Sequence, residues 1–403
     1  MRILLTVWAG AGLDRSPFGD GTPTGAEINV RDYATLWTRW GHDTHVFSLA
    51  REPMDEAVDG ISVHHRVPPP EAQGGTPAAR FEAAVEATRR WTLRLCREHG
   101  IEVLYPRTVF PNGLAGYAAA KELGIPVFPT ADNQEFIRLL DQEDAPARGL
   151  AGSRPLLVET LEHADGVIYL APHLRAAALR FVARHGRHRV IPPGMDLSRF
   201  HRADPRRFRR LLGIGDRPVL LCVARMEPPK RQDLLIRAIP MIAAAVPEVL
   251  VVFAGSGSTL DHHRWLAAEL ALGAATCFLG KIPPPEIPDL YAAATLSVCP
   301  TEEEGFPNAL VEALAAGRPV IASAVSPYVE VLQGETAGVT VPNEPGALAR
   351  AAIDLLADAA RLDAMRKAAR RHAARYSLDR SARRVLALFE AARARRRFRG
   401  GRR

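Results

Sequence analysis

The clearest chemical pattern lies in residues 301–317, TEEEGFPNALVEALAAG. Glu304 precedes a short turn, and the apolar spacing after it predicts a helix that begins at Pro307 or Asn308. A helix start presents free N–H groups and partial positive charge, which suit phosphate. Glu304 and Glu312 flank that start, and carboxylates accept hydrogen bonds from hydroxyl groups. The segment fits a nucleotide sugar, although acidic residues also favour helix starts through their charge alone.

Two other loops carry residue types that suit the same ligand. Arg225 follows the strand-like segment PVLLCVA, and Lys230 precedes a helical segment. Two such cations neutralise a diphosphate without a metal, or they are ordinary surface charges. The segment AGSGS, residues 254–258, also joins a strand to a helix. Gly255 and Gly257 would let the backbone approach a ligand, but glycine is common in such turns.

Strand-like and helix-like segments alternate along the chain, which predicts an α/β fold with parallel sheets covered on both faces. The alternation restarts after IPPGMDLSRF, residues 191–200. The pattern therefore predicts two doubly wound Rossmann-like halves facing across a cleft, with ligands beyond the carboxyl ends of the strands. The expected domains are residues 1–193, with the helix 380–397 packing back on them, and residues 194–379.

The first half opens with a strand-like segment and a long glycine-containing loop that ends at Gly25. Gly25 either lets the backbone reach a phosphate or only permits the turn before a helix. We read the first residues as a strand rather than a signal sequence. No apolar run is long enough to cross a membrane.

The charge of the chain is concentrated at one end. Its net charge is +7, but residues 393–403 hold seven arginines and no acid, which leaves 45 basic and 45 acidic residues elsewhere. Such a tail suits anionic lipid or nucleic acid, and it is more often a solvated, disordered end. We expect residues 398–403 to be disordered and expect no nucleic-acid partner. Arginines 89, 90, 94, 97, 175, 180, 184, 187 and 189 leave a peripheral contact with anionic membrane open.

Several motifs are absent from the sequence. The chain has no Asp-x-Asp triplet, no Walker or GxSxG motif, and no HExxH or paired Cys/His spacing. We therefore expect no catalytic metal and place His64-His65 and His262-His263 on the surface. The four cysteines are widely spaced, which indicates buried free thiols in a reducing, cytoplasmic compartment.

In combination, these motifs resemble the retaining family 4 glycosyltransferases, which have the GT-B fold. The match covers residues 191–377 and rests on VARMEPPKRQDLLIRA, AGSGS, and EEEGFPNALVEALAAGRPVIAS with Glu304 and Glu312. Weaker matches are the segment IPPGMDLSRF, residues 191–200, together with Glu330 and Gly338. The resemblance implies transfer of a sugar from a nucleotide-diphosphate sugar to a hydroxyl acceptor, with net retention and no cofactor. Another GT-B activity, such as a phosphorylase or hydrolase, and a non-catalytic sugar-nucleotide-binding protein stay open.

The resemblance also assigns roles. Arg225 and Lys230 would hold the donor diphosphate, and Glu304 would bind sugar hydroxyls, helped by backbone N–H groups in the segment Gly305, Phe306, Pro307 and Asn308, where proline itself has none. Glu312 would bind ribose, Lys281 and Ile282 would face the base, and Gly25 would approach the diphosphate from the first domain. Many relatives carry a histidine facing the sugar where this chain has Asp132 and Asn133. Asp132 would then bind a sugar or acceptor hydroxyl, or would cap the next helix.

Overall fold

The computed structural model describes residues 1–7, 25–50, 52–73, 76–133, 135–141, 153–332 and 336–400. The chain divides into two compact units. Unit 1 comprises Met1–Met195 and Leu378–Arg403, and unit 2 comprises Asp196–Ser377. The expected domain limits at residues 193 and 380 differ from these by two residues. The chain crosses between the units twice, so the N-terminal and C-terminal segments belong to the same unit.

Unit 2 is built on a six-stranded sheet in which all neighbouring strands are parallel. Its spatial order is β11-β10-β9-β12-β13-β14, with the bounds β9 Val219–Val223, β10 Leu250–Ala254, β11 Thr276–Gly280, β12 Leu296–Cys299, β13 Val320–Ser323 and β14 Gly338–Val341. The central strands are buried apolar runs, as expected of a parallel sheet with both faces covered.

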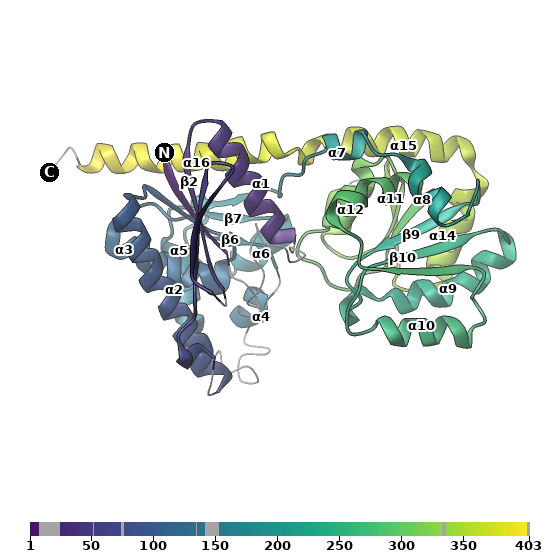
Figure 1. The fold of residues 1–403 in the computed structure, drawn as a ribbon, viewed down its shortest axis with the longest axis horizontal. Helices are drawn as coiled ribbons and strands as arrows, with labels where there is room; N and C mark the ends of the chain where they lie inside the picture. Colours follow the sequence, from purple (N-terminus) through teal and green to yellow (C-terminus); the bar gives the residue numbers. More distant parts are fainter. Residues whose placement is uncertain are drawn as a thin grey trace. The chain divides into compact units, whose positions relative to one another are not determined.

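Helices lie on both faces of this sheet. Figure 1 shows α9 and α10 on one side of it and α11, α12 and α15 on the other. The helices of unit 2 are α7 Ser198–His201, α8 Pro205–Leu211, α9 Gln232–Ala245, α10 Leu260–Glu269, α11 Ile287–Ala293, α12 Asn308–Ala315, α13 Tyr328–Leu332, α14 Pro345–Ala357 and α15 Ala359–Ala373.

Unit 1 contains a five-stranded sheet in the order β3-β4-β2-β1-β5 and a three-stranded sheet in the order β6-β7-β8. A parallel bridge between Leu104 and Val127 connects β5 to the segment that leads into β6. The strands are β1 Arg2–Val7, β2 Asp43–Leu49, β3 Met54–Val58, β4 Ile61–Arg66, β5 Val103–Pro106, β6 Thr130–Ala131, β7 Val167–Tyr169 and β8 His188–Val190. The predicted α/β class with parallel sheets in two domains is confirmed.

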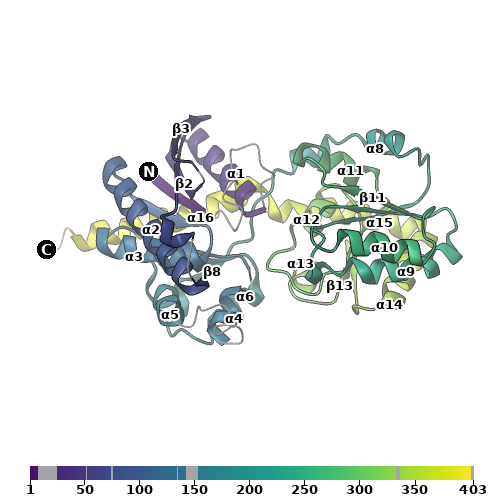
Figure 2. The same ribbon diagram turned by 60° about the horizontal axis from the view of Figure 1, so that its bottom comes forward.

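One edge of the unit 1 sheet departs from the prediction. β3 pairs with β4 in antiparallel fashion, and no strand was predicted there. Figure 2 shows β3 at the rim of the unit, and the strand order places β4 between β3 and β2. The segment MDEAV is polar and mostly exposed, so it lacks the apolar run by which the other strands were recognised.

The core of unit 1 includes the helix that returns from unit 2. The helices of this unit are α1 Gly25–Arg39, α2 Pro77–His99, α3 Leu114–Leu123, α4 Glu135–Asp141, α5 Ser153–His163, α6 Pro172–Ala178 and α16 Leu378–Gly400. Figures 1 and 2 show α16, in yellow, beside α1. The hydroxyls of Tyr33 and Ser381 lie 2.7 Å apart, and the Trp37 ring packs edge-on against Phe389 at 5.7 Å.

The arginine-rich end of α16 is more ordered than predicted. The helix continues to Gly400, past residue 398 where we expected disorder to begin, and residues 401–403 lie outside the described part. Arg396 pairs with Asp165 at 2.8 Å, and Arg393 pairs with Glu102. These ion pairs within unit 1 give the basic segment partners that the local sequence does not reveal.

Other surface arginines also have carboxylate partners. On α2, Arg89, Arg90, Arg94 and Arg97 each lie within ion-pair distance of a glutamate. Arg180 and Arg184 pair with Asp141 and Glu162. Peripheral contact with anionic membrane stays a prediction. Among the described helices, none combines the length and the apolar character that crossing a bilayer requires.

The expected exposure of the histidine pairs is wrong in three of four cases. His64, His65 and His263 are buried, and His262 is exposed. His64 and His65 are adjacent in β4, so they point to opposite faces of the sheet, and both faces are covered there. The expected free thiols are present: Cys96, Cys222 and Cys299 are buried and Cys277 is half-buried.

Candidate functional site

The strand order of unit 2 fixes where its functional loops meet. From β9 the chain passes to β10 and β11 on one side of the sheet, and then to β12 on the other side. The loops that follow β9 and β12 therefore diverge from neighbouring strand ends, which is the position where open α/β sheets bind ligands. Arg225 and Lys230 lie after β9, and Glu304 lies after β12.

A direct ion pair joins these two loops. Lys230 Nζ lies 2.5 Å from Oε2 of Glu304, and both side chains are mostly buried. The Glu302 N–H also donates to the Pro229 carbonyl at 2.8 Å. An ammonium has three donors, so one bond to Glu304 leaves two for a ligand. The structure thus brings two of the predicted site residues together.

The bend before α9 is held by a residue in an unusual conformation. Pro228–Lys230 form a 3-10 turn, and Arg231 has a left-handed φ of 48°. The Arg231 guanidinium lies 3.1 Å from both Asp233 and Glu302. These two ion pairs offset the strain of a non-glycine residue at positive φ and fix the backbone beside Lys230.

The AGSGS loop packs directly against the loop that carries Arg225. The Met226 N–H donates to the Ser256 carbonyl at 2.9 Å, and the Thr259 N–H donates to the Met226 carbonyl at 2.9 Å. A Cβ on Gly255 would lie 1.8 Å from the Ala224 oxygen, and one on Gly257 would lie 2.3 Å from the Met226 oxygen. Both glycines are therefore required for contact between the loops, a role that the sequence analysis did not assign.

Arg225 is exposed at the end of this supported loop. Within the described residues its guanidinium forms no ion pair, so its donors are open to a ligand. The fully buried Gln232 donates through Nε2 to the Arg225 carbonyl at 2.9 Å. Gln232 is a positioning residue that the sequence analysis missed, because a glutamine at a helix start has no distinctive pattern.

The segment before α12 is organised by its own backbone. The Gly305 N–H donates to Oε1 of Glu304 at 3.2 Å, and the Asn308 N–H donates to the Phe306 carbonyl at 3.0 Å. Phe306 is buried with its ring 5.8 Å from Tyr376, and Pro307 is buried beside it. Any ligand contact of Phe306 must come from its backbone. α12 begins at Asn308, as predicted.

Glu312 lies in a less polar setting than Glu304. It is half-buried on α12, and burial raises the pKa of its carboxyl to about 7, against the opposing effects of the Tyr291 hydroxyl and the Arg199 charge. Tyr291 itself donates to the Ala309 carbonyl at 3.0 Å. Near neutral pH, the Glu312 carboxyl is partly protonated, and hydrogen bonds from ligand hydroxyls would favour its ionised form.

Two other predicted contacts belong to loop ends. Lys281 is exposed and Ile282 half-buried directly after β11, and the Gly255 N–H donates to the Gly280 carbonyl at 2.7 Å. This bond connects the loops after β10 and β11. Gly25 is the first residue of α1 in unit 1, and the loop before it lies outside the described residues.

Unit 1 has a corresponding divergence of strands at β1. The chain passes from β1 to β2 on one side and later to β5 on the other. Arg107 directly follows β5. Its backbone N–H donates to the Thr6 carbonyl at the end of β1 at 2.9 Å. Sequence reasoning missed Arg107. The available signal was an arginine directly after a strand, the same pattern that identified Arg225.

Arg107 is buried without full pairing. The residue is 2% exposed, and its Nε and Nη1 atoms find no acceptor in the part of the chain that the structure describes. Nδ2 and Oδ1 of the buried Asn112 also have no hydrogen-bond partner among the described residues. Buried donors of this kind are costly unless a ligand or water meets them, so this end of the sheet is a second candidate binding region.

Asp132 lies close enough to Arg107 to respond to its charge. Burial raises the pKa of Asp132 to about 6, and the Arg107 guanidinium opposes part of that rise. The adjacent Asn133 accepts the Glu135 N–H at 3.0 Å through Oδ1, so Asn133 rather than Asp132 caps the start of α4. This leaves the Asp132 carboxyl available for a ligand hydroxyl and commits the Asn133 oxygen to the helix.

Comparison with known proteins assigns the family. Residues 205–372 match the model for glycosyl transferases group 1, and residues 24–194 match the glycosyl transferase 4-like domain. A relative from Mycolicibacterium smegmatis, named GDP-mannose-dependent alpha-(1-6)-phosphatidylinositol monomannoside mannosyltransferase, is 31% identical over 69% of this chain and 73% of its own length. The chain belongs to the group 1 glycosyl transferases. The predicted membership of family 4 and the GT-B type are confirmed.

Other relatives of this glycosyl transferase cover more of the chain. The D-inositol 3-phosphate glycosyltransferase of Segniliparus rotundus is 29% identical over 93% of this chain and 86% of the relative. Among solved structures, sucrose-phosphate synthase from Thermosynechococcus elongatus has a TM-score of 0.81 at 24% identity and covers 98% of this chain and 99% of its own. Anabaena HepE, in complex with UDP and glucose, has a TM-score of 0.75 at 20% identity over 96% and 99%. These structures share the fold.

We expect Gly255→Ala to destabilise this glycosyl transferase by at least about 2 kcal/mol, because the new Cβ cannot coexist with the Ala224 carbonyl. The φ of 147° adds strain. Urea unfolding measures the effect. Gly273→Ala is the matched control, since nothing lies within 4 Å of its added Cβ. Equal stability of the two variants would contradict the packing role of Gly255.

We expect the effect of Glu312→Gln on stability to depend on pH. The raised pKa means that the folded protein binds a proton more tightly than the unfolded chain, so wild-type stability falls as pH rises from about 4.5 through about 7. Between pH 5 and pH 8, the free energy of unfolding of Glu312→Gln should rise by about 2–3 kcal/mol relative to that of the wild type. Urea unfolding at several pH values tests this, and Glu269→Gln, which changes an exposed glutamate, is the control. A pH-independent difference would refute the raised pKa.

Proposed function

We propose that this glycosyl transferase moves a sugar from a nucleoside-diphosphate sugar to a hydroxyl group of an acceptor that carries an anionic group. We further propose that the reaction retains the anomeric configuration and uses no catalytic metal. The observation that carries the donor proposal is the meeting of Lys230 and Glu304, with Arg225 on the same loop as Lys230, where the loops after β9 and β12 diverge. Cations, hydroxyl acceptors and helix N–H groups lie on neighbouring loops there.

In the proposed mechanism, the bond between the anomeric carbon and the leaving diphosphate oxygen breaks as positive charge develops on the sugar. Arg225 and Lys230 stabilise the negative charge that grows on the diphosphate. Their role is supported by the exposed guanidinium of Arg225 and by the two ammonium donors that Lys230 retains beside Glu304. The Glu304 carboxylate would orient sugar hydroxyls, and Glu312 would accept hydrogen bonds from the ribose.

Retention requires the acceptor to attack from the face that the diphosphate leaves. A bond then forms between the acceptor oxygen and the anomeric carbon, and the acceptor proton passes to the departing phosphate oxygen. The leaving group serves as the base, so no dedicated basic side chain is needed. Asp132, with its pKa of about 6, would bind a hydroxyl of the sugar or of the acceptor.

The acceptor proposal rests on Arg107. A buried guanidinium with two unpaired nitrogens suits an anionic oxygen, and charge-assisted bonds of this kind are stronger than neutral ones. The names of the relatives above include inositol 3-phosphate and phosphatidylinositol monomannoside. Both support a polyol acceptor that bears a phosphate.

The function is tested by incubating the full chain with a panel of nucleotide sugars and inositol 3-phosphate, followed by product analysis with and without acceptor. We expect a glycosylated acceptor, and Arg225→Ala should lower kcat by about 10²–10³-fold, the cost of losing one fixed stabiliser of the developing charge. The exposed Arg264→Ala on α10 is the matched control and should retain wild-type turnover.

Three outcomes would contradict this proposal. Free sugar as the sole product would identify a hydrolase, and sugar phosphate formed with added phosphate would identify a phosphorylase. Donor binding by calorimetry without turnover would identify a non-catalytic binding protein. Near-normal turnover in a folded Arg225→Ala variant would remove Arg225 from the mechanism.

Replacing Arg107 tests the acceptor separately. We expect Arg107→Gln to raise the KM for inositol 3-phosphate by about 10–100-fold, which corresponds to losing one hydrogen bond to a charged group, while the donor KM stays within about twofold. Wild-type preference for inositol 3-phosphate over inositol should disappear in the variant. Arg90→Gln, an exposed arginine on α2, is the control. An equal rise in the KM for inositol and for inositol 3-phosphate would show that Arg107 does not recognise the phosphate group.

A further inference from the structure

Three histidines from separate elements of unit 1 converge beside its sheet. His45 lies on β2, His64 lies on β4, and His99 is the last residue of α2. One ring nitrogen from each lies within 4.8 Å of the other two. His45 and His64 are buried and His99 is half-buried. Neither the donor region nor the acceptor region described above uses any of them.

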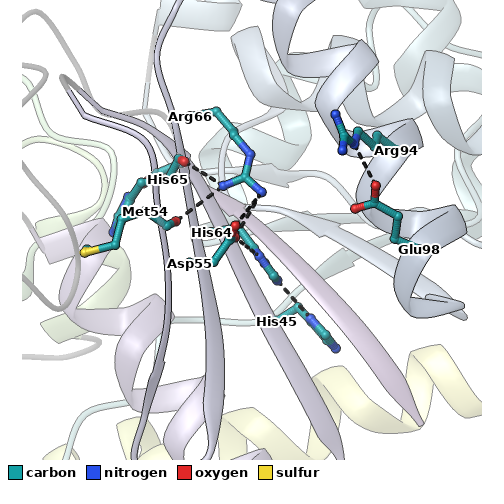
Figure 3. A network of polar contacts seen from close by, with 9 residues as sticks. His45, Met54, Asp55, His64, His65, Arg66, Arg94 and Glu98 are labelled. Atoms are coloured by element: carbon teal, nitrogen blue, oxygen red, sulfur yellow. Dashed lines mark hydrogen bonds and ion pairs between the residues drawn. The ribbon is translucent and has the colours of Figure 1, made fainter.

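The two buried rings face each other through defined atoms. His45 Nδ1 lies 3.1 Å from His64 Nε2, and the rings are parallel within 6°. Figure 3 shows this contact and the carboxylate of Asp55 behind His64. Two imidazole nitrogens bound to one tetrahedral zinc ion at 2.0–2.1 Å are about 3.3 Å apart. The observed separation is close to that value.

The opposite nitrogen of each ring lies beside a carboxylate. His64 Nδ1 donates to Asp55 Oδ1 at 2.7 Å, and His45 Nε2 lies 3.2 Å from Asp43 Oδ1. Metal-bound histidines usually direct their second nitrogen to such a carboxylate, which fixes the tautomer. With protons on those two outer nitrogens, His45 Nδ1 and His64 Nε2 both present lone pairs to the space between them.

The number of available protons favours an ion in that space. Two neutral rings carry two protons, and the contacts of His64 with Asp55 and with His45 use both. His45 Nε2, which lies 3.2 Å from Asp43 Oδ1, is then left without a proton, and it has no hydrogen-bond partner among the described residues. A cation between the two facing nitrogens satisfies all of these groups at once.

We propose that His45, His64 and His99 bind one Zn²⁺ ion through one ring nitrogen each, with water as the fourth ligand. Zinc is the ion of choice because it accepts neutral imidazole ligands in tetrahedral geometry. The ion would join the C-terminal end of α2 to β2 and β4, so its role is structural. It is independent of the proposed sugar transfer, which needs no metal.

The test uses the full chain after treatment with a chelator and dialysis. Calorimetric titration with ZnCl₂ should give one ion per wild-type chain, and Zn²⁺ should raise the Tm of the wild type. Asp55→Asn should weaken binding by about 10–100-fold, the usual effect of losing a partner of a ligating histidine. His64→Gln and His99→Gln should weaken it further. His262→Gln, which removes an exposed histidine of unit 2, is the matched control.

Substituted Co²⁺ provides a second readout that does not depend on stability. Wild type and His262→Gln should show the visible absorption of tetrahedral Co²⁺, and His99→Gln should not. Since His99 is half-buried at a helix end, its variant should fold even if replacement of the buried His64 disturbs the core. Failure of the wild type to bind Zn²⁺, or equal affinity in His99→Gln and His262→Gln, would overturn the proposal.

Discussion

The point at which successive parallel strands diverge to opposite sides is the constraint on which both candidate regions depend. In unit 2 it brings the loops after β9 and β12 together, so that Lys230 and Glu304 meet although 74 residues separate them. In unit 1 it brings the ends of β1 and β5 together and places Arg107 between them. The sheet thus provides the position, and the side chains of the loops provide the chemistry.

Rigidity around Arg225 comes from backbone contacts more than from its own side chain. The glycines of the AGSGS loop allow two loops to touch, and the buried Gln232 holds the Arg225 carbonyl. A cation on such a support needs little reorganisation when charge develops on a ligand, which is how preorganised sites stabilise a transition state. The exposed end of the side chain remains free to contact a ligand.

The sequence predicted the fold well where local signals and tertiary structure agree. α12 begins at Asn308, one of the two predicted starts, because the apolar periodicity of the segment marks where this helix begins. Lys230 and Glu304 were found through motif spacing. β3 was missed because its burial pattern is weak, and Arg107 was missed because its significance arises from burial without partners. The histidine cluster was missed because its members are 19 and 35 residues apart along the chain.

The return of α16 to unit 1 has a consequence for how the chain folds during synthesis. The core of unit 1 includes Val385, Leu386 and Phe389, which pack with side chains of α1 and β1. Those residues leave the ribosome only after all of unit 2 has been made. Until then, the apolar surface around Trp37 and Tyr105 stays exposed to solvent. Unit 2 is continuous in sequence and is able to complete its core first. The nascent first unit is therefore the part of this enzyme for which protection by chaperones matters most.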